Sequence, residues 1–141
     1  MNPEAEGLQL LADGRHHSPH TILGLHQDGK DWVIRAIRPF AKSVVAKGKK
    51  DSYELTHRFG GVWEYQGKGK LPGDYRLVAT YESAPEWVSD DPYRYLPMIG
   101  DLDLHLIGEG RHEQLWQALG AHLVEQSDSL GDTSGVSFTV W

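Results

Sequence analysis

Short runs of apolar, β-branched and aromatic residues, separated by turns rich in Gly, Pro and Lys, occupy the middle of this 141-residue chain. These runs fall at residues 31–38, 42–47, 52–59, 61–67 and 74–81. In the last run, apolar side chains recur at every second position from Tyr75, as they do on a half-buried strand. No helical period separates the runs. The pattern therefore predicts a mainly β fold, an immunoglobulin-like antiparallel β-sandwich, with a small barrel as the alternative.

One short helix is expected ahead of these strands. Residues 3–14 have the sequence PEAEGLQLLADG, preceded by an asparagine. Asn2 suits the N-cap, Pro3 suits the first helical position, and Gly14 suits the left-handed residue that ends a helix. Gly7 lowers the helix propensity of this segment, so the predicted helix is a short one.

The pattern changes after residue 81. Residues 82–97 contain three prolines and follow neither a helical nor a strand period. Aromatic residues are scarce in disordered segments, so Trp87, Tyr93 and Tyr95 predict an ordered connector instead of a flexible linker.

The stretch 99–116, IGDLDLHLIGEGRHEQLW, concentrates acids and histidines. Residues 101–106 alternate as a strand would, but the glycines and acids around them favour a short helix, and the pattern leaves both open. Residues 111–119 predict a helix with one apolar stripe that ends at Gly120. Residues 135–141 alternate as a strand that has no turn or partner after it, as if the chain were cut there.

Charge and composition narrow the classes of partner. The net charge is −6, the isoelectric point is about 5.7, and the only basic cluster is KGKK at residues 47–50. Binding to nucleic acid needs clustered Lys and Arg, so no nucleic-acid partner is expected. The chain has no cysteine, no positively charged leader and no run of about 18 apolar residues. We therefore expect a cytoplasmic protein that does not contact a membrane.

Two clusters could carry chemistry, and both have simpler explanations. Asp101 and Asp103 could approach the spacing of about 5–5.5 Å that a retaining glycosidase needs between its carboxyl groups. Acids in the first turn of a helix are equally explained by the helix dipole, so no catalytic residue is expected here. The histidines of residues 16–26 are dense enough to suggest zinc. They lack a convincing fourth ligand and Pro19 interrupts them, so we expect neither a metal nor a cofactor.

Aromatic side chains are the better candidates for binding. Trp63 and Tyr65 lie two residues apart on a predicted strand and therefore point the same way, which is the arrangement of a sugar-stacking platform. Trp32 is a third candidate for contact with a glucan. Packing of these rings in the core explains the same pattern and stays open as the alternative.

Four stretches together resemble the amino-terminal part of bacterial 1,4-alpha-glucan branching enzymes, which build glycogen and belong to the alpha-amylase superfamily. They are HHSPHTILGLH at residues 16–26, IRPFA at 37–41, DPYRYLPMIGDLDLHLIGEGRHEQLWQALGAHL at 91–123 and GVSFTVW at 135–141. The resemblance covers nearly the whole chain. It implies an N-terminal immunoglobulin-like sandwich at residues 1–96, a helical connector at 97–120, and at 121–141 the truncated start of a second sandwich akin to a family 48 carbohydrate-binding module.

The resemblance also implies a function. Enzymes of this family cleave an alpha-1,4-glucan and rejoin the freed segment through an alpha-1,6 bond by a retaining mechanism, with catalytic carboxylates on a barrel beyond residue 141. No carboxylate of this chain matches those motifs. We therefore expect a non-catalytic module that influences glucan binding and the length of transferred branches. Its expected partners are weakly bound alpha-1,4-glucan or glycogen and the downstream modules of the same polypeptide. The alternative is a purely structural spacer that solubilises or positions the catalytic part.

Overall fold

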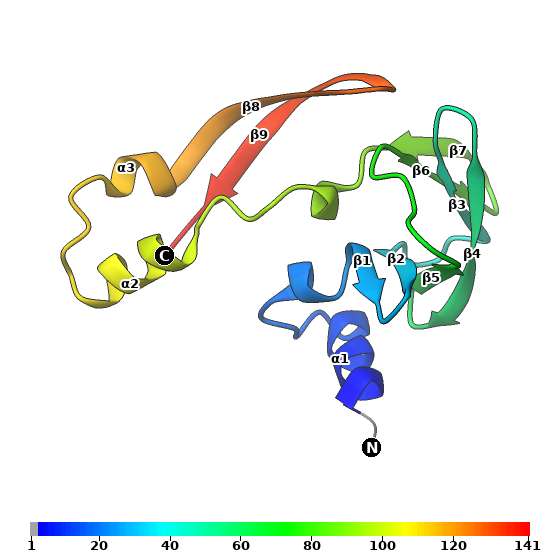
Figure 1. Cartoon of the computed structure of the whole chain (residues 1–141), viewed down its shortest axis with the longest axis horizontal. Coiled ribbons are helices and arrows are strands. Elements are labelled where there is room, and N and C mark those ends of the chain that lie inside the picture. Colours follow the sequence, from blue (N-terminus) through cyan, green and yellow to red (C-terminus); the bar gives the residue numbers. More distant parts are fainter. Residues whose placement is uncertain (1–2) are drawn as a thin grey trace. The chain divides into compact units, whose positions relative to one another are not determined.

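Strands dominate the computed structural model, which describes residues 3–141 and confirms the predicted mainly β class (Figure 1). The chain divides into two units, Met1–Tyr95 and Leu96–Trp141. The helix predicted at residues 3–14 is present as α1 (Pro3–Ala12), and Gly14 after it has a φ of 68°. The expected capping role of Asn2 lies outside the described residues.

The first unit contains one sheet of seven antiparallel strands in the order β1-β2-β5-β4-β3-β6-β7. The five predicted strands are confirmed as β2 (Asp31–Ile37), β3 (Ser43–Lys47), β4 (Ser52–Phe59), β5 (Val62–Gly67) and β6 (Arg76–Tyr81). The sequence did not predict the two edge strands, β1 (Gly24–Asp28) and β7 (Ala84–Ser89). Both have one side without a strand neighbour and therefore lack the apolar alternation of the central strands.

Strand β4 turns the sheet into two layers. In its first half, Leu55 is the residue that pairs with Val44 of β3. In its second half, Thr56 pairs with Glu64 of β5. One strand therefore changes partner between adjacent residues, which is how a strand forms the corner of a sandwich. One layer contains β1, β2 and β5, the other contains β3, β6 and β7, and β4 joins them.

The core lies between the two layers and explains the alternating pattern of the sequence. Ile34 and Ala36 of β2 face inward from one layer, while Val44 of β3 and Leu77 of β6 face inward from the other. Ile34, Val44 and Leu77 have no exposed surface at all. Burying side chains of this size stabilises the folded state by about 1.5–3 kcal/mol each.

Helix α1 covers the outer face of the first layer. Leu8 and Leu11 pack with Leu23 and Val62, and all four are buried. Arg35 of β2 donates to Glu4 of the helix at 3.0 Å and to Glu64 of β5 at 2.6 Å. The helix is thus held by an apolar contact and by an ion pair to a strand beneath it.

Residues 82–97 are ordered, as predicted, but they are not merely a connector. They form β7, which pairs with β6, and then the short helix η2 (Pro92–Arg94). A second short helix, η1 (Pro19–Thr21), lies among the histidines ahead of β1. Trp87 does not anchor this segment by burial, because 52 % of its side chain is exposed.

The second unit contains α2 (Asp101–Gly108), α3 (Leu115–Ala118), β8 (Gly120–Asp128) and β9 (Gly131–Thr139). The structure decides the ambiguous stretch 101–106 in favour of a helix, whose first turn is closed by the Gly100 N–H donating to Asp103 Oδ2 at 3.0 Å. The helix predicted at 111–119 is confirmed only over its four-residue α3.

The C-terminal strand is longer than predicted and has a partner. β9 pairs with β8 along its whole length, from Asp128 opposite Gly131 to Gly120 opposite Thr139. The sequence did not predict that this strand has a partner before it in the chain. β8 escaped prediction because it has the sequence GAHLVEQSD, in which polar residues interrupt the apolar pattern. That this hairpin opens a second sandwich stays a prediction.

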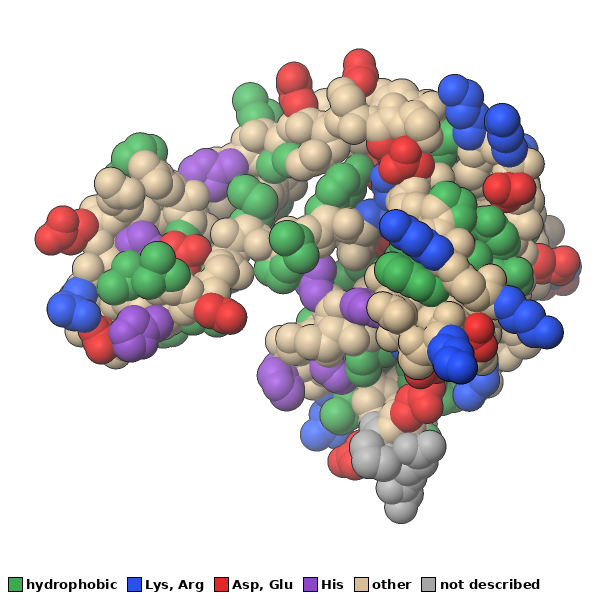
Figure 2. Space-filling model, in the orientation of Figure 1, with side chains coloured by type: hydrophobic (Ala, Val, Ile, Leu, Met, Phe, Trp, Pro, Cys, Tyr) green, Lys and Arg blue, Asp and Glu red, His purple; other side chains and the backbone are tan. Residues whose placement is uncertain are grey.

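The surface shows no concentration of one charge on the face in view. Figure 2 shows Lys and Arg side chains alternating with acidic side chains over the sandwich. Among the described residues, no helix has the length and apolarity needed to cross a membrane. The absence of a nucleic-acid partner stays a prediction.

Phe40 provides a test of backbone strain in the turn between β2 and β3. It has a φ of 64° and is 95 % exposed, so its ring gains almost nothing from packing. Phe40→Gly is expected to raise the free energy of unfolding by about 1 kcal/mol, because glycine has no Cβ to clash in the left-handed region. The measurement is urea unfolding. Phe40→Ala is the matched control, which removes the ring but keeps the Cβ. A glycine variant no more stable than the alanine variant would show that the turn is not strained.

Candidate functional site

The three aromatic residues predicted from the sequence point toward the sandwich interior. Trp63 is 6 % exposed and lies in the core, where its indole N–H donates to the Arg38 carbonyl oxygen at 3.2 Å. Trp32 and Tyr65 are partly buried against the same core, and Tyr65 packs against Tyr53 with ring centroids 5.0 Å apart. Trp63 therefore has no free face for a sugar and serves the core. Sugar contact by Trp32 or Tyr65 stays a prediction.

One tryptophan of the first unit outside that set is exposed. Trp87, on edge strand β7, has 52 % of its side chain exposed, and the guanidinium of Arg38 lies over its ring at 5.2 Å from the ring centroid. Arg38 donates to the Ile37 carbonyl oxygen at 2.8 Å and to Ser89 Oγ at 2.9 Å. Sequence reasoning treated Trp87 as an anchor of a connector, because β7 shows no strand period.

The buried carboxyl group of Asp91 lies at the start of η2, at the end of the sandwich unit. Asp91 is 1 % exposed, and its carboxyl accepts from the Tyr75 hydroxyl at 2.7 Å and from the Tyr93 N–H at 3.0 Å. Burial raises the pKa of Asp91, and the two hydrogen bonds oppose that rise. Burial also raises the pKa of Tyr75, with the Asp91 carboxyl adding to the effect. The pair is a structural contact within the fold and has no opening to a substrate.

A second set of polar contacts surrounds the neighbouring residue Asp90. Arg94 donates to Asp90 Oδ1 at 2.5 Å and to the Gly73 carbonyl oxygen at 2.9 Å. The Tyr95 hydroxyl donates to Asp90 Oδ2 at 2.5 Å. These contacts join residues 90–95 to one another and to the loop before β6. The DPYRY stretch, which carries part of the resemblance, thus fastens the end of the first unit to its own sandwich.

Gly24 explains why η2 can lie so close to β1. Its φ is 89°, and a Cβ built there would collide with the Tyr93 carbonyl oxygen. Only glycine tolerates both the left-handed backbone and this close approach. Gly24, the first residue of β1, therefore allows the close packing against Tyr93, whose N–H donates to Asp91.

Asp101 and Asp103, the two acids of the second unit with the spacing considered for catalysis, lie in α2. Asp103 Oδ1 lies 2.7 Å from His112 Nε2, and its other oxygen caps α2 through Gly100. His112 Nδ1 accepts from the Gln114 N–H at 3.2 Å, which assigns the ring proton to Nε2 as the donor to Asp103. The hydrogen bond from His112 holds the pKa of Asp103 below its usual range, with the Gly100 N–H contributing. Asp101 and Asp103 are two residues apart on a helix and do not face each other.

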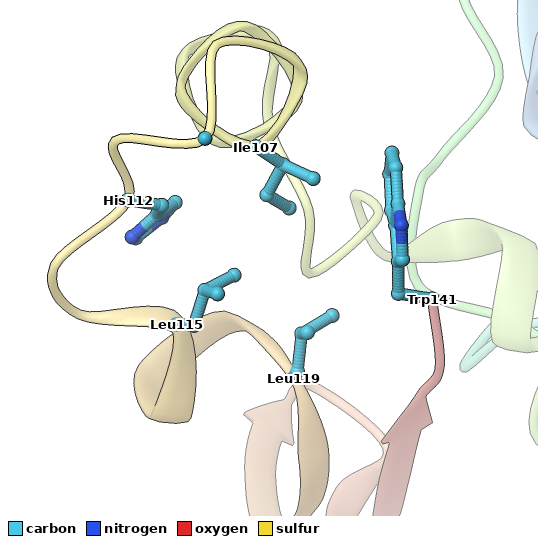
Figure 3. Close-up of a pocket in the computed structure, with 6 residues that line it drawn as sticks. Ile107, His112, Leu115, Leu119 and Trp141 are labelled. Carbon is cyan, nitrogen blue, oxygen red and sulfur yellow. The ribbon is translucent and has the colours of Figure 1, made fainter.

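A small hollow of about 260 Å³ lies in the second unit, between α2, α3 and the end of β9 (Figure 3). Its lining is Ile107, Gly110, His112, Leu115, Leu119 and Trp141. The one imidazole in this lining has both ring nitrogens in hydrogen bonds. The hollow therefore offers apolar surface and no free acid or base.

The histidines near the N-terminus are engaged with the fold around them. His16 Nδ1 accepts from the Ser18 N–H at 3.0 Å, and His26 Nε2 lies 2.7 Å from the Leu23 carbonyl oxygen. His20 packs edge-on against Tyr93. In the part of the chain that the structure describes, no group of three or more His, Asp or Glu side chains is placed to hold a metal ion.

Comparison with known proteins gives a consistent set of relatives. A family model described as alpha-1,4-glucan branching enzyme GlgB, N-terminal domain, matches residues 4–93. Proteins named 1,4-alpha-glucan branching enzyme GlgB are similar over nearly the whole chain. That of Thermobifida fusca is 47 % identical over 95 % of this chain and 18 % of its own length. That of Rhodococcus jostii is 47 % identical over 99 % of this chain and 19 % of its own.

A third relative agrees with these two. The enzyme of the same name from Mycobacterium tuberculosis H37Rv is 45 % identical over 100 % of this chain and 19 % of its own length. The chain thus spans about a fifth of the length of the curated relatives it matches.

The buried pair can be tested by removing one hydroxyl. Tyr75→Phe is expected to lower the free energy of unfolding at neutral pH by about 1–3 kcal/mol, because buried Asp91 loses a donor. The difference from the wild type should shrink as the pH rises above 10.0, the ordinary pKa of tyrosine. The unfolded wild type then releases a proton that the folded state retains, so folding loses this contribution as the pH rises.

The measurement is denaturant unfolding of both proteins from neutral to alkaline pH. Burial also raises the pKa values of Tyr53 and Tyr95, but both residues are present in wild type and variant, so their effects cancel in the comparison. A stability difference that stays constant across this range would contradict the role given to the Tyr75 proton.

Proposed function

This chain belongs to the family of N-terminal domains of alpha-1,4-glucan branching enzymes, and from that premise we propose that it is a non-catalytic module that influences glucan binding and branch length. The observation that carries the proposal is the correspondence between the matched residues, 4–93, and the sandwich unit, Met1–Tyr95. That unit has its own core and its own C-terminal closure through Asp91. It therefore has the features of an accessory module attached to a larger enzyme.

The chemistry of the parent enzyme is part of the proposal. Its relatives are named for branching of 1,4-alpha-glucan, and we assign the same retaining transfer to the full protein, with glycogen in the cytoplasm as its product. Retaining transfer needs two carboxyl groups about 5–5.5 Å apart, one of them ionised and free to attack. Glu64 is paired with two arginines and Asp103 with His112, so these acids support the fold. We place the catalytic carboxylates in the part of the enzyme after residue 141.

The second unit is proposed to connect this module to the next. Residues 121–141 would open a second sandwich akin to a carbohydrate-binding module. The hairpin of β8 and β9 supports this, because Leu123 is 89 % exposed and Phe138 is 76 % exposed. A hairpin of two strands is only marginally stable alone in water, and further strands would cover these side chains. The downstream modules of the same polypeptide are thus the expected partners.

A purely structural spacer is the rival function. The extensive fastening of residues 90–95 favours it, because a rigid exit from the sandwich is what a spacer requires. The two functions differ in one property, since a spacer has no affinity for glucan.

Deletion of the sandwich from the full-length enzyme tests the effect on branch length. Removing residues 1–95 is expected to shift the distribution of branch lengths while leaving part of the branching activity, because the catalytic groups remain. The products are debranched and the chain lengths are measured. Thermal unfolding of the truncated enzyme is the control for its integrity. A product profile identical to that of the full enzyme would contradict the proposed influence.

Titration of the 141-residue chain separates the module from the spacer. Maltoheptaose is expected to produce a saturable change in tryptophan fluorescence and in amide chemical shifts. A cello-oligosaccharide of similar length, with beta linkages, is the matched control and is expected to produce a much smaller change. Linear, unsaturable responses to both sugars would support the spacer.

A further inference from the structure

Trp87 differs from the other tryptophans of the sandwich unit in its exposure. Trp63 is 6 % exposed and Trp32 is partly buried against the core, whereas 52 % of the Trp87 side chain is exposed. Trp87 lies on edge strand β7, opposite Ala79 of β6. A half-exposed indole on a rigid sheet contributes little to the stability of the folded state. Trp87 is therefore a candidate for ligand binding.

The ring of Trp87 is held from one side. The Arg38 guanidinium lies over it at 5.2 Å, and Arg38 is itself fixed by the Ile37 carbonyl oxygen and by Ser89 Oγ. Stacking of this kind restricts the side chain before any ligand arrives, which lowers the entropy lost on binding. Within the described residues the indole N–H of Trp87 donates no hydrogen bond, so it is available to a hydroxyl group.

The surroundings of Trp87 favour a sugar over a protein partner. Adjacent residues of a strand face opposite sides, so exposed Val88 does not extend the apolar surface around the ring. One isolated ring is far smaller than the 1,200–2,000 Å² that a standard protein interface buries. Pro85 lacks an N–H, which makes β7 a poor edge for the addition of a strand from another chain.

A pyranose ring of a sugar fits the exposed surface and the N–H group of Trp87. Its C–H face is apolar and about as large as one aromatic ring, and a hydroxyl group of a neighbouring glucose unit can accept from the indole N–H, which lies in the plane of the ring. We propose that Trp87, backed by Arg38, is a stacking site for a glucose unit of an alpha-1,4-glucan. This site rests on the proposed function. Trp87 takes the place of buried Trp63 as the candidate for contact with glucan.

The test uses the 141-residue chain labelled with nitrogen-15 and titrated with maltoheptaose. The indole N–H signal of Trp87 is expected to shift on titration, and that of Trp63 to stay in place. Trp87→Ala is expected to weaken the affinity by about tenfold or more, which is the loss of about 1.4 kcal/mol of binding free energy. Trp87→Phe keeps a flat ring and is expected to weaken it by about threefold. Trp116→Ala is the matched control, because Trp116 is 69 % exposed in the other unit, and it should leave the affinity unchanged.

Arg38 acts through the indole and is a positioning residue. Arg38→Gln is expected to lower the heteronuclear NOE of the Trp87 indole N–H, with that of Trp63 unchanged, and to weaken maltoheptaose binding by about threefold. A loss of affinity without a change in the order of the Trp87 ring would overturn this role. Thermal unfolding of each variant confirms that the sandwich is intact.

The outcomes separate this inference from the proposed function. Saturable binding that Trp87→Ala abolishes or weakens as stated supports the stacking site. Saturable binding that Trp87→Ala leaves unchanged overturns the site and leaves the glucan-binding module in place. The absence of saturable binding in the wild type overturns both the site and glucan binding by this chain.

Discussion

Strand β4 belongs to both layers of the sandwich, and the position of nearly every other residue in the first unit follows from it. Leu55 pairs with β3 and the next residue, Thr56, pairs with β5. This corner brings the inward faces of β2 and β6 together, so Ile34 and Leu77 are buried against one core. Because side chains of a strand alternate between faces, the same register fixes which aromatic rings point inward.

The closure of the sandwich depends on buried polar groups. Asp91 is removed from water and keeps its hydrogen bonds only if Tyr75 and the Tyr93 N–H meet it correctly. Gly24 makes that approach possible, since any Cβ there would meet the Tyr93 carbonyl. A mismatch at these positions would leave a buried carboxyl unsatisfied, which costs more than the loss of an exposed contact. This explains why residues 90–95 are structural although they contain acids, an arginine and tyrosines.

The same logic separates structural acids from candidate binding groups. The carboxylates of Glu64 and Asp103 are held by partners within the fold, whereas the ring of Trp87 is half exposed with Arg38 over it. The chain belongs to the branching-enzyme family, so the difference between the paired acids and the exposed Trp87 ring bears on its function. A module of such an enzyme is proposed to present a surface to glucan, and catalysis is proposed to lie elsewhere in the polypeptide.

Local patterns determined much of this structure. Short runs of β-branched and aromatic residues between turns predicted β2 to β6, and Pro3 and Gly14 correctly marked the two ends of α1. Short-range pattern failed where burial is weak. It missed edge strands β1 and β7, it missed β8, and it left residues 101–106 open between strand and helix.

The candidate site shows the same division. The sequence established that Trp63 and Tyr65 share a face, because neighbours two apart on a strand point the same way. Whether that face meets water or the core depends on which strand lies opposite, and only tertiary structure decides it. The register of β2 and β5 turned both rings inward, and the β6–β7 pairing left Trp87 at an edge. The sequence alone determined which residues are neighbours along a strand, and long-range strand pairing decided which of them remain exposed.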